Sequence, residues 1–172
     1  TVTALTQATN AVLTFSGTVP TVTTLTATAS PNTVQYTSGS SQTMLGTTYH
    51  HLTLSGSATK TLGGNATING TLTVGTGSTF DPTSSYTATG SGTNTLDVTG
   101  TIKIQHSTFA GSFASFETRT MNSGAVVDYS LAGAQTVDGT LTYYGLTISG
   151  TGTKTPNGHL TINGALTSSA GT

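Results

Sequence analysis

Residues 49–74 read YHHLTLSGSATKTLGGNATINGTLTV, and residues 143–168 read YYGLTISGTGTKTPNGHLTINGALTS. The two stretches align without a gap at an offset of 94 residues, and most of their positions are identical. A chain that repeats itself at this scale usually stacks one supersecondary unit on the next, because a single unit cannot bury its own apolar face. The repetition therefore predicts an extended architecture rather than an enzyme, which needs one unique arrangement of side chains.

The duplication continues on the N-terminal side of this block. Three residues recur at an offset of 93, and a weaker apolar pattern further upstream recurs at 94. The first set pairs Tyr36, Gln42 and Gly46 with Tyr129, Gln135 and Gly139, and the second pairs Phe15, Gly17, Val19 and Val22 with Phe109, Gly111, Phe113 and Phe116. We therefore predict one elongated repeat domain over residues 1–172, made of two degenerate units at approximately 1–78 and 79–172.

The composition favours an extracellular β-protein. Only 5% of the residues are charged, where about 25% is typical. Roughly a quarter are Thr, a β-branched residue that fits a pleated strand. The net charge of −1 does not provide the basic patch that nucleic-acid binding requires. The chain has no Cys, which excludes a disulfide framework and a thiolate metal site, and no apolar run approaches the ~20 residues of a membrane-spanning helix.

Alternating apolar and polar residues predict short strands throughout the chain. Apolar side chains take every second position in residues 34–36, 52–54, 72–74, 102–104 and 146–148, which is the pattern of a half-buried sheet. Gly, Asn and Ser interrupt these runs, as short-stranded all-β folds require. Three Asn-Gly pairs, at residues 69–70, 157–158 and 163–164, predict turns in which φ is positive.

A shorter internal echo suggests the length of one coil. Residues 67–74 (TINGTLTV) resemble residues 97–104 (DVTGTIKI) at an offset of 30. Coils of about 20–30 residues are typical of a solenoid, so we predict an all-β, Thr/Gly-rich parallel β-solenoid. In this register Ile68 and Val98 share one inward column, and Leu72 and Ile102 share another. Two tandem β-sandwich domains of about 90 residues each remain the alternative.

The repeated signature resembles the repeat regions of large secreted bacterial surface proteins. The matching elements are Gln-Thr-(apolar)-x-Gly, Tyr-x-x-Leu-Thr-(Leu/Ile)-Ser-Gly, Lys-Thr and Thr-Ile-Asn-Gly-x-Leu-Thr, which cover roughly residues 35–77 and 128–168. Such proteins look like the β-solenoid stalks of adhesins and autotransporter passengers. The resemblance implies surface display, adhesion or filament building, and it carries no catalytic residues to transfer.

Residues capable of chemistry are few and scattered. A polysaccharide-cleaving site needs carboxylates that converge on one cleft, and the acids lie far apart in the sequence and are not preserved in both copies, so we predict no catalytic residue. His50 and His51 are adjacent and point to opposite faces of a strand, so we predict no metal site, and no motif indicates a cofactor. Lys60 and Lys154 are expected to be surface charges that discourage unwanted sheet pairing. The five acids are Asp81, Asp97, Glu117, Asp128 and Asp138.

Thr-x-Thr pairs are the most distinctive surface feature. Each pair presents two hydroxyls on one face of a strand, and stacked pairs can order water, bind glycans or pack against an identical row. An ice-binding protein is therefore one alternative function, although Thr is also simply a soluble strand former. The pairs are Thr59/Thr61, Thr71/Thr73, Thr99/Thr101, Thr118/Thr120 and Thr153/Thr155.

We predict a non-catalytic structural protein at the cell surface, acting as a stalk module or as the subunit of a filament. Its partners are copies of itself joined head-to-tail by strand pairing, or adjacent repeats of a longer chain, with no nucleic acid and no membrane span. The expected assembly edges include Val2, Leu5 and Leu166, where the ends of the repeat carry ordinary strand sequence. The alternatives are a carbohydrate-binding adhesin module, with Tyr49, Tyr143 and Tyr144 as glycan contacts, and a polysaccharide-active β-helix enzyme.

Overall fold

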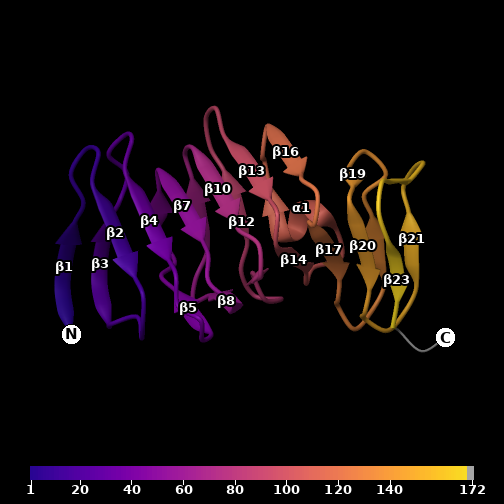
Figure 1. Cartoon of the computed structure of the whole chain (residues 1–172), viewed down its shortest axis with the longest axis horizontal. Helices are drawn as coiled ribbons and strands as arrows, with labels where there is room; N and C mark the ends of the chain where they lie inside the picture. The colour runs from indigo at the N-terminus through magenta and orange to yellow at the C-terminus, as the bar shows by residue number, and fades with distance from the viewer. Residues whose placement is uncertain (170–172) are drawn as a thin grey trace.

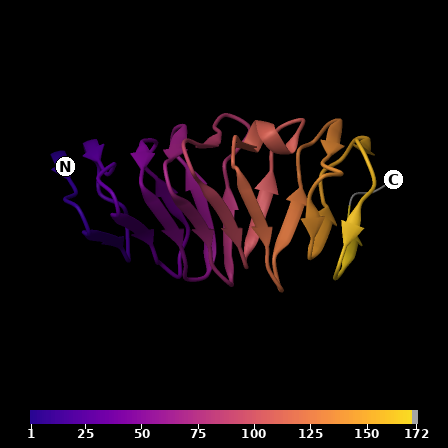
Figure 2. The same cartoon turned by 90° about the horizontal axis from the view of Figure 1, so that it is seen from above.

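The computed structural model describes residues 1–169 as a parallel β-solenoid of about eight turns. The chain advances steadily along one axis, so that the first strand, β1 (Val2–Thr6), and the last strand, β23 (Leu166–Ser168), lie at opposite ends of the long dimension (Figure 1). Every strand pairing is parallel, and each turn stacks on the one before it (Figure 2). The predicted solenoid is therefore confirmed, and the alternative of two antiparallel sandwiches is excluded. Residues 170–172, the end of the predicted second unit, lie outside the described residues.

Three long sheets form most of the wall. The six-stranded sheet holds β2 (Val12–Phe15), β4 (Thr33–Tyr36), β7 (His51–Leu54), β10 (Thr71–Val74), β13 (Thr95–Val98) and β16 (Thr118–Met121). The seven-stranded sheet holds β5 (Gln42–Met44), β8 (Ala58–Leu62), β11 (Ser78–Asp81), β14 (Thr101–Ile104), β17 (Val126–Tyr129), β20 (Gly145–Ile148) and β23 (Leu166–Ser168). The four-stranded sheet holds β6 (Thr48–Tyr49), β9 (Ala66–Ile68), β12 (Ala88–Gly90) and β15 (Phe113–Ala114).

Shorter pairings complete the first and last turns. They are β1 (Val2–Thr6) with β3 (Val22–Thr26), β18 (Gln135–Val137) with β21 (Lys154–Pro156), and β19 (Thr142–Tyr143) with β22 (Thr161–Ile162). A one-turn helix, α1 (Phe109–Ser112), follows β14, and the Thr108 side chain caps it by accepting a hydrogen bond from the Gly111 N–H. The five strands expected from alternation appear as β4, β7, β10, β14 and β20.

The core is a set of apolar columns that run along the axis. In the six-stranded sheet, Val34, Leu52, Leu72 and Leu96 are aligned in successive strands, and all four are fully buried. Their Thr neighbours point outward, because successive residues of a strand face opposite sides. Burying one such Leu contributes roughly 1.5–3 kcal/mol, so the stacked columns supply the main driving force for the fold.

The register inferred from the 30-residue echo is wrong. Ile68 pairs with Gly90 in the four-stranded sheet, whereas Val98 pairs with Val74 in the six-stranded sheet. Leu72 and Ile102 are likewise on different sheets, in β10 and β14. The echo compares two corners of similar sequence, one between β9 and β10 and the other between β13 and β14. The true advance per turn is shorter, at 20 residues from Leu52 to Leu72 and 24 from Leu72 to Leu96.

The 94-residue repeat does not place its two copies on the same face. Tyr36 and Leu52 lie in β4 and β7 of the six-stranded sheet, but their equivalents Tyr129 and Leu146 lie in β17 and β20 of the seven-stranded sheet. The second copy is therefore displaced by one face around the axis as well as along it. The repeat spans four turns and one further face.

The Asn-Gly pairs lie at corners between strands, as expected, but not for the expected reason. Gly70, Gly158 and Gly164 are not among the residues with positive φ. Gly70 is instead closely packed, because a Cβ atom there would lie 2.7 Å from Cε1 of the His51 ring and 3.1 Å from the His50 carbonyl oxygen. A second close approach joins Gly46 to the Gly64 backbone, where a Cβ on Gly46 would lie 2.4 Å from the Gly64 Cα.

Candidate functional site

Each copy of the repeat contains the same buried pair of tyrosines. In the first copy the Tyr36 and Tyr49 hydroxyls are 3.2 Å apart, and Tyr36 Oη accepts a hydrogen bond from the Leu45 N–H while Tyr49 donates to the Leu45 carbonyl. Both rings are fully buried, and burial raises the pKa of both hydroxyls. Through their bonds to the Leu45 N–H and carbonyl, the two hydroxyls fix the loop that follows β5.

The second copy repeats this arrangement with one substitution. The Tyr129 and Tyr143 hydroxyls are 3.1 Å apart, and they bond to the N–H and carbonyl of Asp138 in place of Leu45. The prediction that Tyr49 and Tyr143 contact glycans is wrong, because both side chains are fully buried. Of the three proposed contacts, only Tyr144 is exposed, at 36%.

The two repeated lysines are internal hydrogen-bond donors. Lys60 Nζ donates to the carbonyls of Ser38 at 2.6 Å, Ser57 at 3.2 Å and Ser40 at 3.3 Å, and the residue is fully buried. The expectation that it is a surface charge is therefore wrong. Burial lowers the pKa of Lys60, since a desolvated ammonium loses part of its hydration. The lysine ties two successive loops together across one turn.

Lys154 makes the same three contacts in the second copy. Its Nζ donates to the carbonyls of Gly133 at 2.6 Å, Leu131 at 2.8 Å and Thr151 at 2.8 Å. Lys154 is only half-buried, but its role is structural as well. Neither role was predicted from the sequence. The recurrence of Lys at the same position after a Gly-containing loop in both copies could have indicated a shared structural role.

The repeated glutamines connect the edge strands β5 and β18 to the preceding turn of the solenoid. Gln42 Nε2 donates to the carbonyls of Gly17 at 2.7 Å and Phe15 at 2.9 Å, and its Oε1 accepts from the Ser38 N–H at 3.2 Å. Gln135 Nε2 donates at 2.8 Å to both Ile104 and His106. Ile104, rather than Phe109, is therefore the structural counterpart of Phe15, and α1 belongs to an insertion in the second copy.

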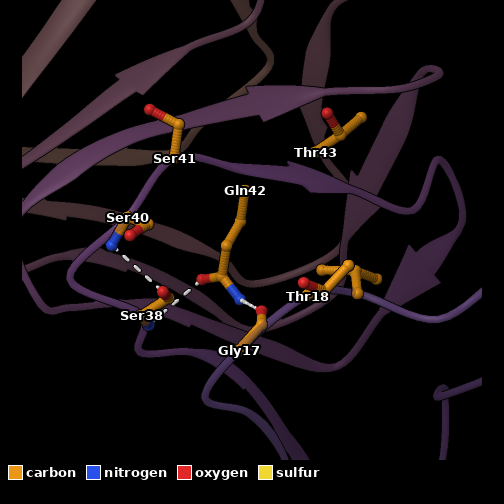
Figure 3. A pocket seen from close by; sticks show the side chains of 8 residues that line it. Gly17, Thr18, Ser38, Ser40, Ser41, Gln42 and Thr43 are labelled. Carbon is orange, nitrogen blue, oxygen red and sulfur yellow. Dashed lines mark hydrogen bonds between the residues drawn. The ribbon is translucent and has the colours of Figure 1, made fainter.

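A groove lies beside β5, where the seven-stranded sheet ends on its N-terminal side (Figure 3). We call it the β5 groove. It has a volume of about 420 Å³, and none of its lining side chains is charged. Gln42 reaches across its floor toward Gly17, while Ser41, Thr43 and Thr18 stand around it (Figure 3). The lining residues are Gly17, Thr18, Val19, Ser38, Ser40, Ser41, Gln42 and Thr43.

A second hollow, of about 380 Å³, lies beside α1, and Asp138, which forms an ion pair with Arg119, is among its lining residues. Arg119 Nη1 lies 2.7 Å from Asp138 Oδ2, and the Arg119 guanidinium lies 5.3 Å from the Phe109 ring centroid. Burial alone would raise the pKa of Asp138, but hydrogen bonds from Thr140 and Arg119 outweigh it and lower that pKa. In the first copy the equivalent positions hold Leu25 and Leu45.

The other acids do not gather at one site. Asp81 lies 3.8 Å from Lys103, Asp97 accepts a hydrogen bond from Asn122, and Asp128 accepts one from Ser149. Glu117 is exposed in the loop before β16. Among residues 1–169 no three His, Asp or Glu side chains are grouped closely enough to hold a metal ion.

The two adjacent histidines make separate structural contacts. His51 Nδ1 accepts a hydrogen bond from the Thr71 N–H at 3.0 Å, and His50 Nε2 lies 3.2 Å from Ser30 Oγ. Their ring centroids are 4.3 Å apart. Burial, with a smaller contribution from His50, lowers the pKa of His51.

The Thr-x-Thr pairs are distributed over several faces. Thr71/Thr73 and Thr118/Thr120 face outward from the six-stranded sheet, and Thr59/Thr61 belongs to the seven-stranded sheet. The outward rows of the six-stranded sheet are interrupted: His51 stands between Thr33 and Thr71, and Asp97 stands between Thr73 and Thr120. These rows do not form one continuous threonine array.

The expected assembly edges are terminal strands. Val2 and Leu5 belong to β1, which ends the β1–β3 sheet, and Leu166 belongs to β23, which ends the seven-stranded sheet. Val2 is 37% exposed and Leu166 is 62% exposed.

Comparison with protein families, with curated protein sequences and with solved structures finds no match for this chain. Within the part of the chain that the structure describes, no helix is long and apolar enough to cross a membrane. The class that the fold defines is that of parallel β-solenoids.

Proposed function

We propose that this chain is a non-catalytic structural module that builds a rod by end-to-end stacking of solenoid turns, outside the cell. One observation carries the proposal. In the seven-stranded sheet Val127 and Leu146 are 0% and 1% exposed, whereas Leu166, the next residue in the same inward column, is 62% exposed. An inward apolar position left open at the last strand is suited to coverage by a further turn.

The backbone of β23 supports the same contact. The Ser169 N–H donates to the Ile148 carbonyl, so Leu166 and Ser168 direct their own N–H and carbonyl groups toward the open side. These groups are available to a parallel strand of a second copy. The neighbouring strand β21 is less suitable, because Pro156 has no N–H to offer.

The interior of the module supports a mechanical role. Polar side chains hydrogen-bond one turn to the next, as Lys60, Lys154 and Gln42 do. The acids are dispersed over several elements, which favours a structural role over polysaccharide cleavage. A low charge and a Thr-rich surface suit a secreted module, and this localisation is part of the proposal.

Sedimentation velocity over a range of protein concentrations tests this function. We expect species larger than one chain at high concentration, and little change with salt because few charges contribute to the contact. Leu166→Pro removes an N–H only on the open side of β23, so it should abolish the larger species while the chain still folds. Leu166→Val keeps that N–H and serves as the control. A single species at every concentration, identical for all three proteins, would contradict the proposal.

A further inference from the structure

The two copies of the repeat differ at one edge strand. In the second copy, the Thr136 N–H of β18 donates to the Ser107 carbonyl at 2.7 Å, and Thr108 forms a parallel bridge with Thr136. Thr108 has an extended backbone, with φ −138° and ψ 162°, and it immediately precedes α1. The edge of β18 is therefore covered by a short extended segment of the chain itself.

The equivalent edge in the first copy is open. Thr43 of β5 occupies the position of Thr136, and it lines the β5 groove. The Gly63 N–H donates to the Met44 carbonyl, just as the Asn157 N–H donates to the Val137 carbonyl in the second copy. The backbone groups of Met44 and Val137 thus face the next turn, and those of the residue before each of them face the other way. Thr136 directs its N–H to Ser107, whereas Thr43 directs its backbone groups into the β5 groove.

The segment that should cover β5 does not reach it. Residues 17–19 form the far wall of the groove, and among the described residues only the Gln42 side chain hydrogen-bonds this wall to β5, through the Gly17 carbonyl. Pro20 follows directly and has no N–H to contribute to a ladder. Within residues 1–169, the Thr43 N–H and carbonyl have no backbone partner outside the β5–β8 ladder, from which they point away.

We propose that the β5 groove binds an extended, uncharged, Ser/Thr-rich peptide segment of another protein, which pairs in parallel with β5 through Thr43. The second copy shows the geometry in the same molecule, since Ser107 and Thr108 occupy this place at β18. Charged segments are disfavoured, because the groove offers no counter-charge and its buried Gln42 is already bonded through both polar atoms. Main-chain hydrogen bonds supply affinity, as in other cases of strand addition.

Amide hydrogen exchange on the unmodified protein tests the open edge without any substitution. The Thr43 amide should exchange faster than the Thr136 amide, because only Thr136 donates to a main-chain carbonyl. Addition of the capped peptide IQHSTFA, the sequence of residues 104–110, should slow exchange at Thr43 and leave Thr136 unchanged. Equal protection of the two amides in the free protein would overturn the proposal. Protection of the Thr43 amide that increases with protein concentration, without added peptide, would show that a second copy of this chain fills the groove. That result would also overturn the proposal.

A groove-filling variant provides the second test. A Cβ on Gly17 meets no atom within 4 Å, so Gly17→Leu can fill the groove without a backbone clash. It should weaken binding of the labelled peptide by about tenfold or more. Thr79→Leu, on the outward face of β11, is the matched control and should leave binding unchanged. Peptide binding that survives Gly17→Leu, or that a peptide with proline at its Ser and Thr positions reproduces, would show that the groove is not the site.

Discussion

Lys60 and Lys154 occupy the same position of the repeated unit but lie on different faces of the solenoid. Lys60 belongs to β8 of the seven-stranded sheet, and Lys154 belongs to β21 of a separate two-stranded sheet. Each Nζ nevertheless donates to three main-chain carbonyls. The repeat therefore preserves a set of contacts between successive turns and not a position on the surface.

We predict that Lys60→Met destabilises the protein more than Lys154→Met. Lys60 is fully buried, so its loss leaves three carbonyls without a partner and should cost roughly 2–4 kcal/mol of unfolding free energy. Lys154 is half-buried, so water can replace its bonds and the cost should be about 1–2 kcal/mol. Urea denaturation of the two variants measures both values. Equal losses of unfolding free energy in the two variants would show that burial of the ammonium does not determine how much each lysine contributes to stability.

We predict that Ile68→Asp costs on the order of 3–5 kcal/mol, because it places an unpaired carboxylate in the core. Ile68 is fully buried between Tyr49 and Gly90 of the adjacent strands. Thr67→Asp, one residue earlier and on the outer face, is the control and should change stability by about 0.5 kcal/mol or less. Thermal unfolding of both variants provides the comparison, and an Ile68→Asp variant as stable as the parent would contradict the inward orientation of this position in β9.

The pairs Leu25/Leu45 and Arg119/Asp138 suggest a double-mutant cycle. Arg119→Leu and Asp138→Leu each remove one member of a partly buried ion pair, so each should be destabilising. The double variant restores the apolar pair of the first copy and should lie within about 1 kcal/mol of the parent. The expected coupling energy is roughly 1–3 kcal/mol. Additive single effects would mean that the two side chains do not act as a pair.

Stability should fall in mild acid because of His51. Its folded-state pKa is lowered below the unfolded value of about 6.5. The unfolded chain therefore takes up the proton first, so His51 favours the folded state least at low pH. Stability should be constant above neutrality and decline as the pH falls below about 6.5 toward the folded-state pKa. His51→Gln should reduce this decline when unfolding is measured from pH 8 to pH 5, whereas an unchanged profile would assign it to other groups.

The sequence was sufficient to predict the fold class and the five strands β4, β7, β10, β14 and β20, because both depend on local patterns. Alternation around Leu52 and Leu72 reflects a physical requirement that every solenoid turn must meet. The register was not predictable from the echo, since the corners at Gly70 and Gly100 share a local sequence but lie on different edges. A short sequence similarity indicates similar local geometry at two corners. The register between turns depends on which strands pair, and a short similarity does not show that.

The polar interior could not be predicted from residue type. Lys and Tyr are usually read as surface residues, and nothing in their local sequence shows that loops about 20 residues away present carbonyls to Lys60.

The β5 groove was also not predicted, because it exists only where residues 17–19 do not form a strand. The insertion that carries α1 was the clearest sign in the sequence that the two copies differ here. Aligning Phe15 with Phe109, in place of Ile104, concealed that insertion.

End-to-end stacking is tested most directly by small-angle X-ray scattering across a concentration series of the unmodified chain. We predict that the long dimension grows with concentration while the radius of gyration of the cross-section stays constant, in low and high salt alike. Leu166→Pro should hold the long dimension at the single-chain value. Growth of the cross-section would indicate lateral association through the sheet faces, and a constant long dimension at all concentrations would contradict the stacking of solenoid ends.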